Sequence, residues 1–194
     1  IEDCAQSPGT SYNNRLVGNI PKRIFYQPSS NLISCLTSSS KDLYKISNIP
    51  LEKLWNFQNK SYLEFEMLHS FLWLSKLDIK TSKDFSQKII DSWIKNNFNY
   101  EPNTWKMDIA GKRIIAWVSN THIVLENSKE EYKKKFFLSI IKQSNHIIKN
   151  IKNTSYDSNR LICCSAIILS GLIFKETESN FKFGIVELEK FVQN

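Results

Sequence analysis

The chain has 194 residues, of which 41% are hydrophobic and 12% aromatic, and its formal net charge is +7 at pH 7. This length suits one domain, or a large part of one, with a sizeable core. Five Gly and five Pro are few for such a chain, which disfavours a many-turned β fold and indicates long helices. No apolar run reaches the ~18 residues of a membrane span, so we expect no membrane span.

The first third of the sequence differs from the rest. Residues 1–60 lack sustained periodicity, and stretches such as PKRIFYQPSSNLISCLTSSSKD predict loops and short turns. Apolar residues then recur at three- and four-residue steps, which predicts a helix over about 62–77. A second helix follows Thr81, a typical N-cap residue, with Phe85, Ile89 and Trp93 on one stripe.

Four further features extend the helical pattern to the end of the chain. After Pro102, Asp108 is expected to cap a helix that turns Ile114, Trp117 and Val118 inward. Ser128 and Glu131 have the spacing of a capping box, and the helix they open is predicted to run to about residue 152.

SNRLICCSAIILSGLIF is apolar nearly all round, which predicts a helix central to the packing. NFKFGIVELEKFVQ carries an apolar stripe in helical register: Phe181, Ile185, Leu188 and Val192.

About six helices with short or medium connections predict an all-α fold of antiparallel helical hairpins. A bundle, a helical solenoid and an α/α toroid all fit this periodicity, and no fixed-length repeat decides between them.

The charge and the cysteines restrict the possible sites. Lys is abundant while Arg numbers four, which is typical of an AT-rich genome, and a field of this sign favours anionic partners. Basic stretches interleave with aromatic residues on helices where Phe136 and Phe137 point partly inward, so we expect no nucleic-acid site. Neither Cys4, Cys35 nor the Cys163–Cys164 pair has CxxC spacing, which predicts buried reduced thiols and no metal site.

Five residues are candidates for a site. Asn159 and Arg160 precede the apolar helix, where helix-terminal N–H groups, an amide and a guanidinium can form a carboxylate-binding corner. The alternative is that Asp157 or Ser158 caps the helix and Asn159 lies in its first turn.

The other three candidates lie elsewhere in the sequence. Arg113 is notable because Arg is scarce, although it fits a salt bridge inside the helical layer equally well. His122 flanks an aromatic-rich helix. Trp105, in the loop after Pro102, is the Trp expected to be exposed and able to stack on a sugar ring.

Four segments carry a resemblance to a known family. PKRIFYQPSSNLISCL, LHSFLWLSKL, WKMDIAGKRIIAWVSNTHIVL and SNRLICCSAIILSGLIF occur in the order found in the N-terminal helical domain of heparinase II/III-like polysaccharide lyases. From about Pro21 onward the chain resembles that domain. The resemblance implies an incomplete α/α toroid over residues 21–194 of a bacterial protein. It also implies β-elimination on a uronic-acid polymer, with an acidic polysaccharide as partner.

The resemblance also implies residue roles. In the family, the Asn of an NHL-like motif neutralises the substrate carboxylate, and the matching stretch here is Asn159, Arg160, Leu161, with Arg in place of His. The Tyr and His that transfer protons in the family would lie in a C-terminal domain beyond residue 194. The chain alone is therefore expected to bind weakly and to turn over nothing. Arg160, Arg113, His122 and Trp105 are the expected substrate contacts.

Residues 1–20 form a separate predicted segment with a different likeness. IEDCAQSPGTSYNNRLVGN resembles the cofactor-binding segment of DegT-type sugar aminotransferases, in which the acid matching Asp3 pairs with the pyridine nitrogen of pyridoxal phosphate and the residue matching Gln6 contacts the ring. The Schiff-base lysine motif of that family is missing, so no cofactor is expected. Three functions stay open: a lyase domain, a non-catalytic basic helical adaptor, and a remnant of a pyridoxal-phosphate enzyme. The compartment, cytoplasm or periplasm, stays open too.

Overall fold

The computed structural model describes residues 11–12, 15–16, 54–55, 61–76, 83–155, 157–174 and 178–193. Near the N-terminus, β1 (Ser11–Tyr12) pairs antiparallel with β2 (Arg15–Leu16). The other elements in chain order are helices: α3 (Tyr62–Ser70), the 3-10 helix η4 (Leu72–Lys76), α4 (Lys83–Asn97), α5 (Met107–Ser119), α6 (Thr121–Val124), α7 (Glu130–Asn150), the 3-10 helix η5 (Ile151–Asn153), α8 (Ser158–Ile173) and α9 (Glu178–Gln193). The prediction of an all-α fold is confirmed for the described residues beyond this short hairpin.

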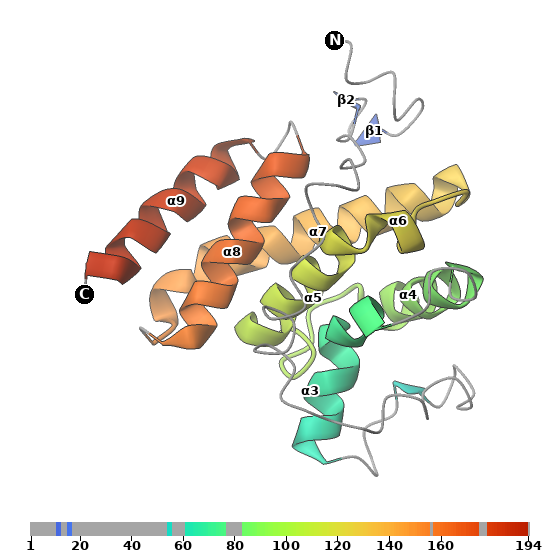
Figure 1. Ribbon diagram of the computed structural model, residues 1–194, viewed down its shortest axis with the longest axis horizontal. Coiled ribbons are helices and arrows are strands. Elements are labelled where there is room, and N and C mark those ends of the chain that lie inside the picture. Colours follow the sequence, from blue (N-terminus) through green and yellow to red (C-terminus); the bar gives the residue numbers. More distant parts are fainter. Residues whose placement is uncertain are drawn as a thin grey trace.

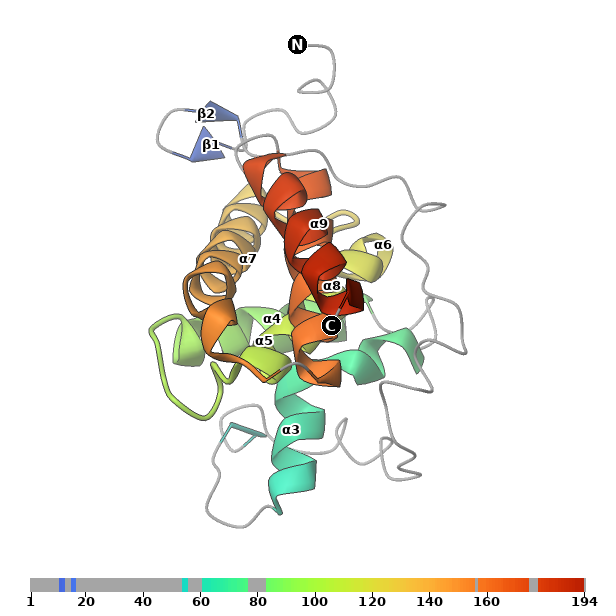
Figure 2. The same cartoon turned by 90° about the vertical axis from the view of Figure 1, so that its left-hand side faces the viewer.

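Helix α5 lies at the centre of the helical layer. It packs against α3 and η4 on one side and against α7 and α8 on others, while α4 packs on α6 and α7 (Figure 1). Helix α8 lies between α5 and α9, and α9 runs back antiparallel along α8 at one edge of the molecule (Figures 1 and 2). This arrangement confirms antiparallel pairing for the α8–α9 hairpin.

Aromatic side chains from four elements form the middle of the core. The indole rings of Trp93 and Trp117 meet edge to face with centroids 5.5 Å apart, and Phe71 meets Trp117 in the same way at 5.4 Å. The Phe136 ring stacks on Trp117 at 5.3 Å. Each of these four side chains is at most 2% exposed. Edge-to-face and offset-stacked arrangements are the ones that the ring quadrupole favours for aromatic pairs. The inward stripes predicted for α4 and α5 are therefore confirmed at Trp93 and Trp117, and Phe136 of α7 is fully buried.

The helix predicted over 62–77 is broken at one residue. Phe71 has φ 58°, in the left-handed region, and it ends α3 as the C-cap before η4 begins at Leu72. Its ring is fully buried among the core tryptophans, so tertiary packing outweighs the backbone cost of this conformation.

The predicted helix starts were partly wrong. The capping box lies at Ser61 and Glu64, each bonded to the other's backbone N–H, at the start of α3. Ser128 instead donates its hydroxyl to the Leu125 carbonyl at 2.8 Å, so α7 begins after Lys129 without a side-chain cap. Asp108 lies inside the first turn of α5, whose N-cap position is Lys106. Thr81 lies outside the described residues.

The α8–α9 contact is built on glycine. A Cβ on Gly184 would lie 2.7 Å from Ile168 Cγ1, and one on Gly171 would lie 2.3 Å from the Phe181 backbone nitrogen. The glycine face of α9 therefore turns toward α8, because only there can the two backbones approach this closely. The fully buried positions of α9 are Asn180, Gly184 and Glu187, beside the predicted stripe. Phe181, Ile185 and Leu188 of that stripe are partly buried, whereas Val192 is 76% exposed.

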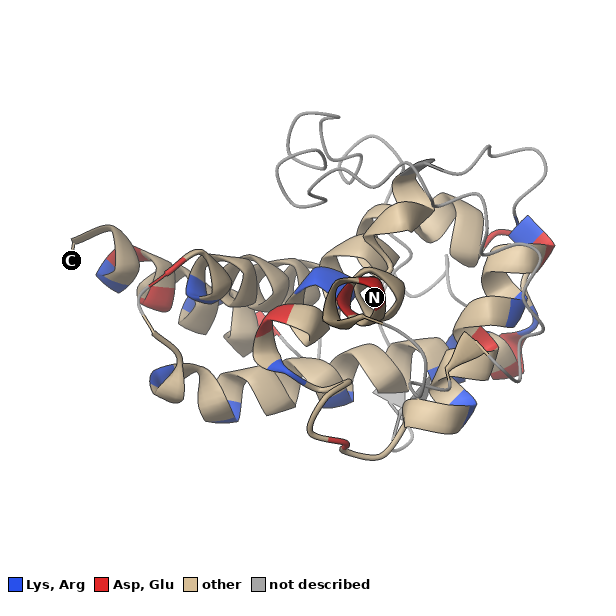
Figure 3. Ribbon diagram, turned by 90° about the horizontal axis from the view of Figure 1, so that it is seen from below, with Lys and Arg blue, Asp and Glu red and all other residues tan. Residues whose placement is uncertain are grey.

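Charged residues of both signs are distributed over several helices. Lys and Arg occur together with Asp and Glu, and neither sign covers a whole helix (Figure 3). Among the described residues, no helix is both long enough and apolar enough to cross a membrane.

Candidate functional site

The first turn of α8 carries the predicted carboxylate-binding corner. Asp157 is the N-cap, and its Oδ1 accepts from the backbone N–H of Asn159 at 2.8 Å and of Arg160 at 3.4 Å. Its other oxygen accepts from the Ser155 hydroxyl at 2.6 Å. These hydrogen bonds, led by that of Ser155, lower the pKa of the Asp157 carboxyl. The local capping interpretation is therefore confirmed, and the chain's own carboxylate occupies the N–H groups that a ligand would use.

Asn159 keeps an accessible side chain in this turn. It is exposed, and none of the described residues hydrogen-bonds its side-chain amide. An amide N–H at this place can donate to a carboxylate oxygen. Its predicted role in neutralising a substrate carboxylate stays a prediction.

Arg160 points into the α8–α9 interface. Its side chain is 4% exposed, and Nη2 lies 2.8 Å from Glu187 Oε2, while Nη1 donates to the Thr154 carbonyl at 3.3 Å. The second Glu187 oxygen accepts from Lys190 at 2.7 Å. Hydrogen bonds from Lys190 first and from Arg160 next lower the pKa of Glu187. The guanidinium thus already has a carboxylate partner inside the protein, and no face of it is open to a glycan in this structure.

Arg113 lies at the centre of the helical layer and is 0% exposed. Its Nε donates to Gln143 Oε1 at 2.6 Å, and its Nη atoms donate to the carbonyls of His69 at 2.9 Å and Thr104 at 3.1 Å. The guanidinium also lies 3.9 Å from the centroid of the Trp93 ring. Burial lowers the pKa of this group. The interior position matches one of the two interpretations made from sequence, but the partners are neutral acceptors and an aromatic ring, not a carboxylate.

Trp105 is 3% exposed, so the expectation that its ring is free to stack on a sugar is wrong. Its Nε1 donates to the Asn97 carbonyl at 3.0 Å, and its ring meets the His146 imidazole edge to face at 5.5 Å. The connection between α4 and α5 folds back over α7, and Trp105 is the side chain that anchors it. A buried Trp whose N–H has a partner is a packing residue.

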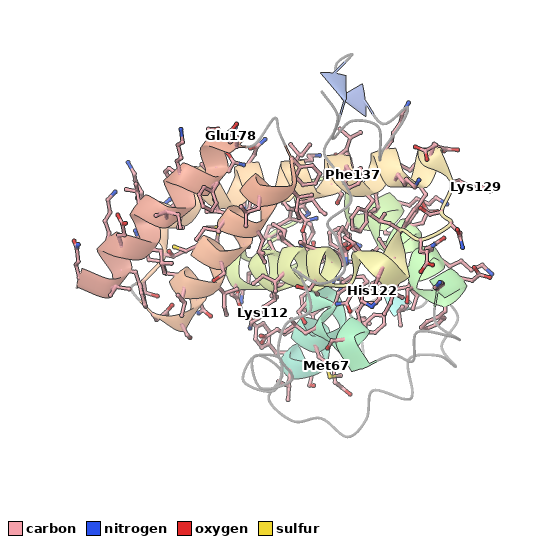
Figure 4. All side chains as sticks on the ribbon, turned by 45° about the horizontal axis from the view of Figure 1, so that its top comes forward. Met67, Lys112, His122, Lys129, Phe137 and Glu178 are labelled. Carbon is pink, nitrogen blue, oxygen red and sulfur yellow. The ribbon has the colours of Figure 1, made fainter. Side chains whose placement is uncertain are left out.

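The five predicted residues do not converge on one place. His122 is partly buried on α6, beyond the last turn of α5, whereas α8 begins beside the first turns of α5 (Figure 1). Figure 4 shows the same separation between Lys112, early in α5, and His122. Asn159 and His122 therefore lie at opposite ends of α5, with Arg113 buried between them.

The other histidines have structural partners. His69 is 1% exposed and its Nδ1 accepts from Trp93 Nε1 at 3.0 Å. His146 is partly buried, and its Nε2 lies 3.1 Å from the Trp105 carbonyl oxygen. Desolvation by burial lowers the pKa of His146. Both side chains hold neighbouring segments in place.

One group of surface side chains was not predicted as a site. Phe98 and Tyr100, in the α4–α5 connection, lie over Lys142 and His146, which are one turn apart on α7. The signal in the sequence was the pair of aromatic residues two apart in NNFNYEP, before an i, i+4 pair of basic residues on a later helix. We refer to Phe98, Tyr100 and Lys142 as the connection platform.

Metal-binding side chains do not cluster in the described part of the chain. No group of three or more His, Cys, Asp or Glu that could hold a metal occurs there. Cys163 and Cys164 are free and buried, as predicted, and burial raises the pKa of both thiols, that of Cys163 to about 12. Asp3 and Gln6, the residues matched to a pyridoxal-phosphate site, lie outside the described residues.

Comparison with known proteins gave no match: no family model, no curated protein and no solved structure is similar to this chain.

Proposed function

We propose that this chain is the helical domain of a heparinase II/III-like polysaccharide lyase that acts on uronic-acid glycans by β-elimination. The proposal includes an incomplete α/α toroid, of which the antiparallel α8–α9 hairpin is one unit. Its support is the order of the four resembling segments, the all-helical fold, and the position of Asn159 in the exposed first turn of α8.

The exposed amide of Asn159 is the observation that carries the proposal. In β-elimination, a base removes the proton next to a carboxylate, and charge that grows on that carboxylate must be stabilised. The backbone N–H groups of the turn are bonded to Asp157, and Arg160 is paired with Glu187. Asn159 therefore offers an exposed amide in this turn that can contact a uronate. The resemblance assigns the proton transfers to a Tyr and a His of a further domain.

Lyase activity of the full-length gene product tests this role. We expect Asn159→Ala to reduce kcat by about 10²–10³-fold, the cost of removing one preorganised donor to a developing charge. Formation of the unsaturated uronic-acid product, followed by its ultraviolet absorbance, is the measurement. Asn145→Ala, at an exposed position of α7, is the matched control and should be silent. Equal activity of the wild type and Asn159→Ala would remove Asn159 from the mechanism.

A second candidate function is a non-catalytic basic helical domain that binds a protein or glycan. It is favoured by the burial of Arg113 and Arg160, which leaves lysines as the accessible cations among the side chains that the structure describes, in a chain with net charge +7. This candidate predicts binding that Asn159→Ala does not change. The third possibility, a pyridoxal-phosphate enzyme, predicts a visible absorbance band on addition of the cofactor, and we expect a flat spectrum.

A further inference from the structure

The α4–α5 connection presents aromatic rings at the surface of α7. Phe98 is 37% exposed and Tyr100 is 62% exposed, although both lie against side chains of α7. The connection is fixed to the core by Trp105, whose ring is buried and whose Nε1 donates to the Asn97 carbonyl. Phe98 and Tyr100 are therefore exposed on a segment that is fixed in position.

Two rings support Tyr100. Its ring centroid lies 5.3 Å from that of His146 and 6.3 Å from that of Trp105. His146 is itself fixed, since its Nε2 lies 3.1 Å from the Trp105 carbonyl and Nδ1 lies 3.4 Å from the Asn150 amide nitrogen. A carbonyl can only accept, so Nε2 carries the hydrogen and Nδ1 accepts from Asn150. The imidazole is therefore a supporting ring, and the Tyr100 ring offers the accessible surface.

A cation without an acidic partner lies next to these rings. Lys142 Nζ is 4.0 Å from the centroid of the Phe98 ring and donates to the Phe98 carbonyl at 2.8 Å and to Asn99 Oδ1 at 3.3 Å. No carboxylate of the described residues lies within ion-pair distance of it. An ammonium has three donors. Two are used by neutral acceptors, and the charge remains uncompensated.

We propose that the connection platform binds one uronic-acid residue of an acidic glycan. The C–H face of the pyranose stacks on Tyr100, and the sugar carboxylate is bound by the Lys142 ammonium. An aromatic face with a cation beside it matches a sugar ring that carries one carboxylate. The choice of an acidic glycan rests on the proposed function. The platform is a binding site separate from the Asn159 turn.

The surroundings of the platform favour a sugar over a nucleic acid. Glu101 directly follows Tyr100, and its carboxylate accepts from the Thr104 N–H at 2.8 Å and the Asn103 amide at 3.2 Å. The Glu101 carboxylate oxygens have further lone pairs that can accept from a sugar hydroxyl close to the ring. Single-stranded nucleic acids require a groove lined by several cations that follows the backbone. The connection platform has a single cation, Lys142.

Isothermal titration of the whole chain tests the platform. The probes are a hexamer of galacturonic acid, maltohexaose as its uncharged counterpart and oligo-dT at the same ionic strength. We expect the hexauronate to bind most tightly. Tyr100→Ala and Lys142→Met should each weaken it by about tenfold, which equals the loss of one stacking or one charged contact. Tyr100→Phe should bind like the wild type. Tyr62→Ala, which removes another exposed tyrosine, should also bind like the wild type.

Several results would overturn this inference. The first is that Tyr100→Ala and Lys142→Met both bind the hexauronate with an affinity within twofold of the wild type. The second is that the wild type does not bind the hexauronate. The third is that oligo-dT binds more tightly than the hexauronate and depends on the same residues. Circular dichroism of each variant separates a lost contact from a lost fold. Failure here is distinguishable from failure of the proposed function. Loss of turnover in Asn159→Ala with unchanged hexauronate binding in Tyr100→Ala removes the platform alone, and the reverse pattern removes the lyase role alone.

Discussion

Replacing Arg113 with methionine removes a fully buried cation while keeping most of the side-chain stem. Four hydrogen bonds from its guanidinium reach Gln143 Oε1 and the carbonyls of His69 and Thr104. In the variant, these three acceptors have no partner from this side chain. The contact between the guanidinium and the Trp93 ring, at 3.9 Å, is lost as well.

The size of the effect follows from those contacts. A buried acceptor left unsatisfied costs about 1–3 kcal/mol, and the substitution affects three of them. Removal of the charge offsets part of this destabilisation, because the folded protein no longer has to desolvate a buried guanidinium. We therefore expect the free energy of unfolding to fall by about 3–5 kcal/mol, a large part of the ~5–15 kcal/mol that stabilises a typical domain.

Urea unfolding followed by far-ultraviolet circular dichroism measures this change, with the slope of the transition as a check on two-state behaviour. Lys134→Met, at an exposed position of α7, removes the same formal charge at the surface and should change stability by no more than about 0.5 kcal/mol. If Arg113→Met lies within ~1 kcal/mol of the wild type, then the hydrogen bonds do not hold α5 to its neighbours as argued.

Three further predictions follow from the packing. Gly171→Ala places a Cβ 2.3 Å from the Phe181 nitrogen, so the unfolding free energy should fall by about 1–3 kcal/mol or more; an unchanged midpoint in urea would contradict the close approach of α8 and α9. The Cys163 thiol, with its pKa raised by burial to about 12, should react with an aromatic disulfide reagent only as fast as the protein opens; rapid reaction of the native protein would show that the thiol is accessible. Burial lowers the pKa of His146, so protonation favours the unfolded chain. The free energy of unfolding should therefore decrease as the pH falls through the unfolded pKa of about 6.5. His146→Gln should make this decrease smaller, and an unaltered pH profile of stability would refute the argument.

Helix content was predictable because it depends on patterns along the chain. The stripes of apolar residues located α4 and α5, and the all-round apolar run located α8. Asp157, one of the two residues named as possible caps of α8, is its N-cap. Local rules failed where a competing contact was not local. Ser128 has the right spacing for a cap but bonds the carbonyl of Leu125, and Phe71 adopts φ 58° because its ring fills the core.

The candidate site was less predictable than the fold. Burial of Trp105, Arg160 and Arg113 depends on partners 8 to 44 positions away along the chain: Asn97, Glu187 and the carbonyl of His69. Sequence patterns indicate which residues are chemically capable of binding an anion. They do not indicate which of them are already bound inside the protein.

Periodicity and composition alone thus specified a helical fold for residues 61–193 that the structure describes, and a net positive charge, since helices arise from neighbours within one or two turns. Three-dimensional packing set the rest. It buried two guanidiniums against internal acceptors and left Asn159 exposed on α8. It also brought Phe98 against Lys142 and Tyr100 against His146, on a helix more than forty residues later. The reason is that a side chain's availability to a ligand depends on contacts between elements distant in sequence, and no local pattern encodes those.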